Sequence, residues 1–147
     1  MKHKILVSAL ANLFFASNNL QAQFAPPVGQ FGTTAMYKDS SAFVSWASAC
    51  HIARGYQDIS NISLGYTTVG DSSLAIGKAG TNGVVSLGDG GYAILEFTSP
   101  ILDGAGNDFA VFENSFDDTF LELAFVEVSS DGINFFRFPA ISNTDTT

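Results

Sequence analysis

The sequence is poor in cysteine and histidine, and each shortage excludes a class of protein. Cys50 is the only cysteine in 147 residues, so the chain is not a disulfide scaffold. His51 is the only histidine after residue 22, which argues against a zinc site. A catalytic pair of Cys50 and His51 is also disfavoured, because adjacent residues of a strand point to opposite faces. We expect Cys50 to be a small, buried apolar side chain.

Positive charge is equally scarce. The chain has six Lys and Arg against fourteen Asp and Glu, a formal net charge of −8. Two of the six, Lys2 and Lys4, lie in the first 22 residues, and none of the acids does. A surface this acidic repels the phosphates of nucleic acids and anionic lipids. We therefore expect no nucleic-acid partner.

The chain has no long hydrophobic run except near its N-terminus. Ile5–Ala16 is largely apolar, follows two lysines, and is followed by a segment that ends on the small residue Ala22. This is the pattern of a secretory signal peptide, and it is shorter than the roughly twenty residues of a membrane span. We predict a signal peptide at 1–22, a domain at 23–147, a secreted or cell-surface location and no membrane insertion after cleavage. An uncleaved anchor is the alternative.

What is abundant is strand-forming sequence, and Leu121–Pro139 shows it best. The segment Leu121–Ser129 is rich in Leu, Phe and Val, which suit a buried pleated surface. Asp131-Gly132 is a hairpin-turn dipeptide, which predicts a tight two-residue turn with the positive backbone φ that such a turn needs. Tyr92–Phe97 alternates between two faces in the same way, as a strand does. Both segments predict antiparallel β-structure.

Shorter segments with glycine turns between them extend this pattern. Ala42–Ile52 favours a strand or a short helix, Gly55–Gly70 is loop-like, and three brief segments are expected to extend. Those three are Ser73–Ile76, Val84–Leu87 and Phe109–Glu113. Short strands with frequent turns indicate an all-β fold, a β-sandwich of the jelly-roll type. Strand spacing assigns six phenylalanines to the core: Phe109, Phe112, Phe125, Phe135, Phe136 and Phe138. The polar end of the chain follows a strong strand without a closing element, so we expect the domain to be an incomplete fragment.

Several unusual strings resemble a known family. VVSLGDGG (84–91), PILDGAGNDFAVFEN (100–114) and LELAFVEVSSDGINFFRFPA (121–140) resemble secreted bacterial cell-surface proteins that carry sorting domains, as in type IX secretion in Bacteroidota or in PEP-type sorting. The string VEVSSDGINFFRF is also similar to a hairpin of galactose-binding-like jelly rolls. The resemblance implies a surface location. Some members of the family sit beside outer-membrane cobalamin-uptake receptors, so the resemblance also implies capture of that nutrient.

Acidic residues cluster in one stretch without a basic neighbour. Six carboxylates fall within twenty residues: Asp103, Asp108, Glu113, Asp117, Asp118 and Glu122. Crowded carboxylates on a glycine-bent loop are the ligands that Ca²⁺ prefers. We expect a structural Ca²⁺ held by Asp103 and Asp108 with Asp117 and Asp118, and the alternative is a solvated acidic rim.

Function is the least determined property. Glu113 and Glu122 resemble a carboxylate pair for glycoside hydrolysis, although the sequence indicates no cleft between them. Four aromatics are expected at a ligand-binding surface, where they would stack on a sugar or a corrin: Trp46, Tyr56, Tyr66 and Tyr92. We predict a binding or adhesion module without catalysis, which captures a glycan or small-molecule nutrient such as cobalamin with an outer-membrane receptor. The alternatives are a glycoside hydrolase and a purely structural surface-layer protein.

Overall fold

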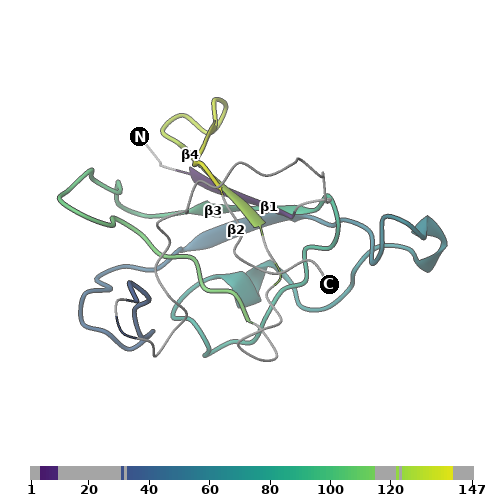
Figure 1. Ribbon diagram of the computed structural model, residues 1–147, viewed down its shortest axis with the longest axis horizontal. Coiled ribbons are helices and arrows are strands. Elements are labelled where there is room, and N and C mark those ends of the chain that lie inside the picture. The colour runs from purple at the N-terminus through teal and green to yellow at the C-terminus, as the bar shows by residue number, and fades with distance from the viewer. Residues whose placement is uncertain (1–3, 10–30, 32, 115–121, 123, 141–147) are drawn as a thin grey trace.

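The computed structural model describes residues 4–9, 31, 33–114, 122 and 124–140. Five strands and two short 3-10 helices form in these ranges. The strands are β1 (Lys4–Ala9), β2 (Ala49–Ala53), β3 (Tyr92–Glu96), β4 (Ala124–Ser129) and β5 (Phe136–Arg137), and the helices are η1 (Ile62–Leu64) and η2 (Ser72–Ala75). The β-rich class expected from the sequence is therefore confirmed, with long loops between short strands (Figure 1).

All five strands join one antiparallel sheet in the order β2-β3-β1-β4-β5. The first strand in sequence, β1, is the middle strand in space, between β3 and β4 (Figure 1). It pairs Lys4 with both Glu96 of β3 and Ser129 of β4. The described residues contain this one sheet and no second sheet packed on it.

Strand β3 forms within the segment Tyr92–Phe97 where the sequence predicts a strand, and it ends at Glu96. Ala93 is buried, and its neighbours along the strand are partly exposed. The C-terminal half of strand β4 has a period of two, because Glu127 and Ser129 are buried while Val126 and Val128 are only partly so. Side chains of successive strand residues point to opposite faces, which produces this pattern.

The hairpin expected at Leu121–Pro139 is present, but its turn differs from the expectation. Strand β4 pairs with β5 through Val128 and Phe136, so residues 130–135 form the connection rather than two residues alone. Gly132 has the expected positive φ of +73°, whereas Asp131 does not have a positive φ. A two-residue turn with positive φ at both positions is therefore wrong.

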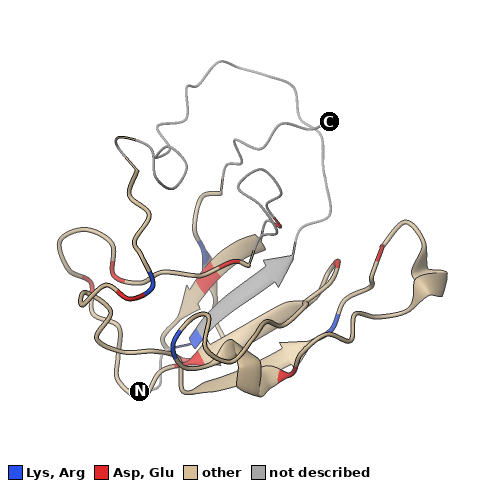
Figure 2. Cartoon of the chain, turned by 90° about the horizontal axis from the view of Figure 1, so that it is seen from below, with Lys and Arg blue, Asp and Glu red and all other residues tan. Residues whose placement is uncertain are grey.

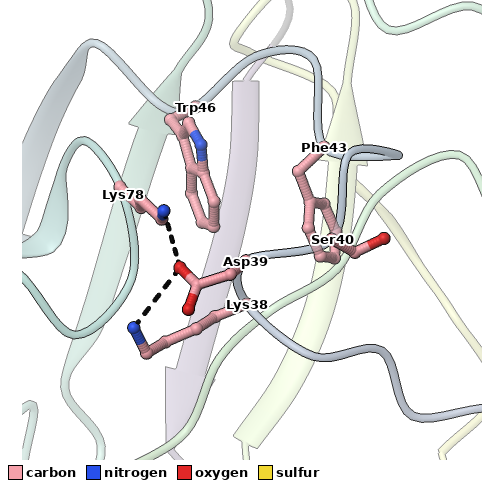
Figure 3. Close-up of a pocket in the computed structure, with 6 residues that line it drawn as sticks. All are labelled: Lys38, Asp39, Ser40, Phe43, Trp46 and Lys78. Carbon is pink, nitrogen blue, oxygen red and sulfur yellow. Dashed lines mark ion pairs between the residues drawn. The ribbon is translucent and has the colours of Figure 1, made fainter.

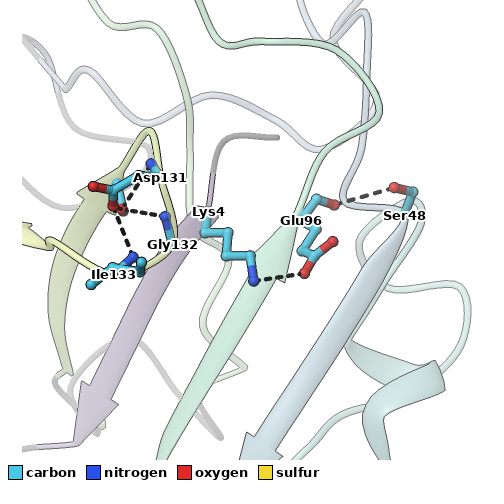
Figure 4. Close-up of polar contacts among 7 residues, drawn as sticks. Lys4, Ser48, Glu96, Asp131, Gly132 and Ile133 are labelled. Atoms are coloured by element: carbon cyan, nitrogen blue, oxygen red, sulfur yellow. Dashed lines mark hydrogen bonds and ion pairs between the residues drawn. The ribbon is translucent and has the colours of Figure 1, made fainter. Parts of the chain in front are cut away.

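Asp131 organises this longer turn through its side chain. Its Oδ1 accepts hydrogen bonds from the backbone N–H groups of Ile133 and Asn134, both at 2.8 Å, and Ser129 Oγ lies 3.0 Å away (Figure 4). Asp and Asn side chains commonly satisfy backbone donors in turns in this way. The dipeptide marked a turn correctly, but the carboxylate rather than the backbone conformation of Asp131 shapes it.

The three brief segments that the sequence predicts to be extended are not strands. Ser73–Ile76 overlaps the 3-10 helix η2, where the Asp71 side chain accepts from the N–H of Ser73 at 2.8 Å. Val84–Leu87 and Phe109–Glu113 belong to no strand. A local Asp–Ser capping contact offers the backbone an alternative to the sheet, which explains the first of these errors.

Assigning all six phenylalanines to the core is also wrong. Phe136 is 72% exposed, Phe138 44% and Phe112 39%. Strand spacing places side chains on a common face, but a face is buried only when another layer covers it. Among the described residues no second layer covers this one, and Ala93 is the only buried apolar residue.

Candidate functional site

A small pocket lies where the segment 38–46 meets the loop that follows η2. Its lining residues come from both segments (Figure 3): Lys38, Asp39, Ser40, Phe43, Trp46 and Lys78. The cavity measures about 90 Å³, whereas pockets for whole drug-sized ligands measure about 300–1,000 Å³. It therefore accommodates one functional group of a ligand rather than an entire molecule.

Two lysines converge on one carboxylate in this pocket. Lys78 Nζ lies 2.6 Å from Asp39 Oδ1, and Lys38 Nζ lies 3.6 Å from the same oxygen (Figure 3). The hydrogen bond from Lys78 holds the pKa of Asp39 below its usual range, with help from Tyr37. The same contact with Asp39 raises the pKa of Tyr37. Two cations face one anion, so the site has a local excess of positive charge in an acidic chain.

Local backbone contacts bring these two segments together. The N–H of Gly77 donates to the carbonyl of Ala47 at 2.9 Å, which ties the Lys78 loop to the chain next to Trp46. Gly80 adopts φ of +73°, and a Cβ there would lie 3.2 Å from Lys38 Cε. The Lys38 stem therefore packs closely against a position that only glycine fits without strain.

The apolar wall of the pocket belongs to a cluster of three aromatic rings. The ring centroids of Phe43, Trp46 and Phe112 lie 5.4–5.5 Å apart in every pair. Tilted and edge-on aromatic pairs at this distance stabilise beyond their buried area. Trp46 is thus fixed by two phenylalanines while part of its ring remains exposed beside the lysines.

The four aromatics expected to bind a ligand do not form one surface. Trp46 lines the pocket, whereas Tyr56 and Tyr66 stack on each other with centroids 4.6 Å apart and an interplanar angle of 17°. Tyr92 lies in β3, opposite Ala53 of β2. The sequence did not lead us to select Lys38, Asp39 or Lys78. Positive charge is scarce after residue 22, so the two lysines could have been recognised as candidate binding residues.

A second, larger cavity of about 270 Å³ lies near the tyrosine stack. It is lined mostly by uncharged polar residues: Gln57, Thr67, Thr68, Val69 and Ser86. Arg54 supports this region because its guanidinium donates to the backbone carbonyls of Val69, Ser86 and Gly70. These bonds join two loops, so Arg54 stabilises the fold and is not free to bind a ligand.

The acidic stretch is only partly described. Asp103 and Asp108 are exposed, and Asp108 Oδ1 accepts the N–H of Gly104 at 2.8 Å, while Asp117 and Asp118 lie outside the described residues. No group of three or more Asp, Glu, His or Cys side chains suited to a metal occurs in the described ranges. Acidic positions there are spread over several loops (Figure 2). The calcium site remains a prediction.

Two other candidates can be placed. Burial raises the pKa of Glu113, the backbone N–H of Glu122 opposes that shift, and the charge of Glu122 adds to it, so the two glutamates are neighbours. Neither of them lines the two cavities described above. Cys50 is half-buried in β2, where burial raises the pKa of its thiol, and His51 beside it is exposed.

No family model, no curated protein and no solved structure matches this chain. The resemblance to secreted surface proteins therefore stays an expectation. No helix within the described ranges has the length and hydropathy needed to cross a bilayer. Over its described residues, the chain is β-rich and has a pocket lined by both aromatic and cationic side chains.

Proposed function

We propose that this protein is a secreted, non-catalytic binding module of the cell surface that recognises an acidic glycan at the Trp46 pocket. One observation carries the proposal: Trp46, Lys38 and Lys78 line the same cavity, with an aromatic wall on one side and two ammonium groups on the other. Aromatic rings stack on the apolar face of a sugar, and ammonium groups bind a carboxylate through charge-assisted hydrogen bonds.

The size and charge of the pocket favour an acidic group over a neutral one. About 90 Å³ admits a carboxylate or a pair of hydroxyls, with the rest of the sugar lying outside. Asp39 forms ion pairs with both lysines. A ligand carboxylate would compete with Asp39 for them, so binding would weaken as salt screens the charges.

The expectations about fold and location complete this proposal. We propose that the domain forms a jelly-roll β-sandwich and that it belongs to the sorted surface proteins whose strings it resembles. Capture of a nutrient, either a glycan or cobalamin, for an outer-membrane receptor fits such a location. A corrin ring is much larger than this cavity, so cobalamin is the less favoured ligand of the two.

The test is calorimetric titration of the intact protein with oligosaccharides that differ only in a uronic-acid carboxylate. Lys78→Gln should weaken binding of the acidic sugar by about tenfold, or about 1.4 kcal/mol. Asp39→Asn removes the internal competitor and should strengthen it. Tyr66→Phe, which lies in the separate tyrosine stack, is the matched control and should change nothing.

Unfolding alone would not weaken binding in Lys78→Gln and strengthen it in Asp39→Asn. Equal binding of acidic and neutral sugars, or no effect of either pocket variant, would overturn the proposal. Cobalamin serves as a further ligand in the same titration.

A glycoside hydrolase is the second candidate, because Glu113 and Glu122 are neighbours and Glu113 has a raised pKa, as a general acid requires. Release of reducing sugar that is lost in Glu113→Gln would favour it. Binding that survives Glu113→Gln without any hydrolysis would favour the binding module.

A further inference from the structure

The middle strand of the sheet comes from the segment that the sequence predicts to be a signal peptide. Strand β1 pairs with β3 over Lys4–Ser8 and with β4 over Lys4–Ala9, antiparallel to both. Strands β3 and β4 therefore run parallel to each other with a space one strand wide between them. A signal peptidase acting after Ala22 would remove the strand that fills this space.

Without β1 the sheet separates into two pairs. Strand β3 would keep only β2, and β4 would keep only β5, because within the described part of the chain no other strand links them. Both facing edges would expose unpaired backbone N–H and C=O groups, which readily pair with another chain. Two-stranded pairs are only marginally stable in water.

We propose that the exported chain accepts an extended strand of a partner polypeptide between β3 and β4, in the place and direction of β1. The inference rests on the export part of the proposed function and is independent of the glycan site. Addition of a strand to sheet edges is an established mode of peptide recognition, in which main-chain hydrogen bonds give affinity and side-chain positions give specificity. Here both edges of the incoming strand are used.

The first position of the incoming strand has a defined chemistry. Lys4 Nζ lies 3.1 Å from Glu96 Oε1, and the loop 131–133 lies on the other side of the Lys4 stem (Figure 4). A Cβ on Gly132 would lie 2.6 Å from Lys4 Cδ. Gly132 thus leaves room for a long side chain, and Glu96 favours a positive charge at its end. The partner strand should begin with Lys or Arg.

A second exported copy is a poor source of this strand. It has lost its own residues 4–9, and in the described part of the chain its remaining strands, β2, β3, β4 and β5, are already paired or face the same unfilled space. A different polypeptide with a free extended segment meets the requirement. We therefore expect a different protein, rather than a second copy of this chain, to supply the strand between β3 and β4.

The test starts from the full chain with a protease site inserted after Ala22. The purified protein is cleaved, unfolded in urea and refolded with a fluorescent peptide of residues 2–10, and capture is measured by anisotropy and co-elution. The proposal expects saturable capture of the peptide by residues 23–147. A peptide with Leu6→Pro should bind at least about tenfold more weakly, because proline removes a ladder donor and is not tolerated in a central strand.

A charge exchange tests the register. A Lys4→Glu peptide should bind the natural chain roughly threefold more weakly, as expected for a partly exposed ion pair. The Glu96→Lys chain should restore binding of that peptide and weaken binding of the natural one. Asp103→Lys, which changes an exposed carboxylate outside the sheet and leaves Glu96 intact, should preserve the preference for Lys4.

Three outcomes would overturn the proposal. The first is the absence of saturable peptide capture by residues 23–147, and recovery of the native circular dichroism spectrum by these residues alone would then mean that the chain fills the space itself. The second is a dimer of residues 23–147 that excludes the peptide. The third is equal capture of the Leu6→Pro peptide. Glycan titration of the intact chain is a separate measurement, so either proposal can fail without the other.

Discussion

Arg137 of β5 and Glu127 of β4 lie opposite each other and form an ion pair in which two guanidinium nitrogens contact one carboxylate oxygen. Arg137 Nε donates to Glu127 Oε1 at 2.6 Å, and a second guanidinium nitrogen lies 2.5 Å from the same oxygen. The guanidinium also lies 4.0 Å above the ring of Phe125. Glu127 is only 8% exposed, so its carboxylate depends on this partner.

Loss of Arg137 should therefore destabilise the fold. Arg137→Leu leaves a buried carboxylate without its cation and should lower the free energy of unfolding by about 2–3 kcal/mol, measured in urea. The double variant with Glu127→Gln should cost less than the sum of the two single changes. Strict additivity would show that the pair is not coupled.

Gly132→Val should cost on the order of 1–2 kcal/mol or more, because a β-branched residue is strained at φ of +73°. Contact with Lys4 should add to this cost. Gly65→Val is the matched control, since Gly65 has φ of +80° with open space around it. Thermal melting of both variants separates backbone strain from contact. A melting temperature unchanged by Gly132→Val would contradict the positive φ.

Acid should weaken the turn at Asp131. Hydrogen bonds from the backbone and side chain of Asn134, then from Ile133 and Ser129, hold the pKa of Asp131 far below its usual range. A depressed folded-state pKa gives stability that is present above the unfolded value of about 3.9 and is lost as the pH falls below it. The free energy of unfolding should therefore fall more for the wild type than for Asp131→Asn when the pH is lowered from about 5 to about 2, the range in which such a carboxylate titrates. Parallel pH profiles of urea unfolding would argue against it.

Calcium should stabilise the protein if the acidic stretch holds it. An ion that binds only the folded state adds RT ln(1 + [L]/Kd), about 2.7 kcal/mol at a hundredfold excess over Kd. Chelator should lower the melting temperature, and Asp103→Asn with Asp108→Asn should abolish that response. Magnesium should substitute poorly because it demands a smaller octahedral site. Unfolding that ignores both chelator and added Ca²⁺ would leave a solvated acidic rim.

Export should remove residues 1–22. The two lysines, the apolar run and Ala22 predict cleavage before Gln23. Mass spectrometry of the exported protein checks this directly. An intact N-terminus on the exported chain would reject cleavage and would leave β1 as a permanent strand.

The sequence predicted those features of the fold that depend on neighbouring residues. The alternation of Tyr92–Phe97 predicted β3, and the positive φ of Gly132 followed from the turn dipeptide. Both depend on backbone sterics and on a side-chain period of two, which act over a few residues. The errors at Ser73–Ile76 and at the Asp131 turn arose where a carboxylate capped the backbone instead.

For the candidate site, the sequence selected Trp46 but not its charged neighbours. Asp39 and Lys78 are far apart in the chain, and contacts between their two segments, such as the hydrogen bond from Gly77 to Ala47, bring them together. The exposure of Phe136 was likewise not predictable, because burial depends on whether another layer covers the face.

By itself, then, the sequence determined that this chain is acidic, rich in short antiparallel strands and poor in the residues that disulfide or zinc proteins need. Only the tertiary structure decided which strands are neighbours. It placed β1 between β3 and β4, and it joined Arg137 to Glu127 and Lys78 to Asp39. Pairings of this kind depend on long-range contacts, and the backbone hydrogen bonds that make them are the same for almost every residue type.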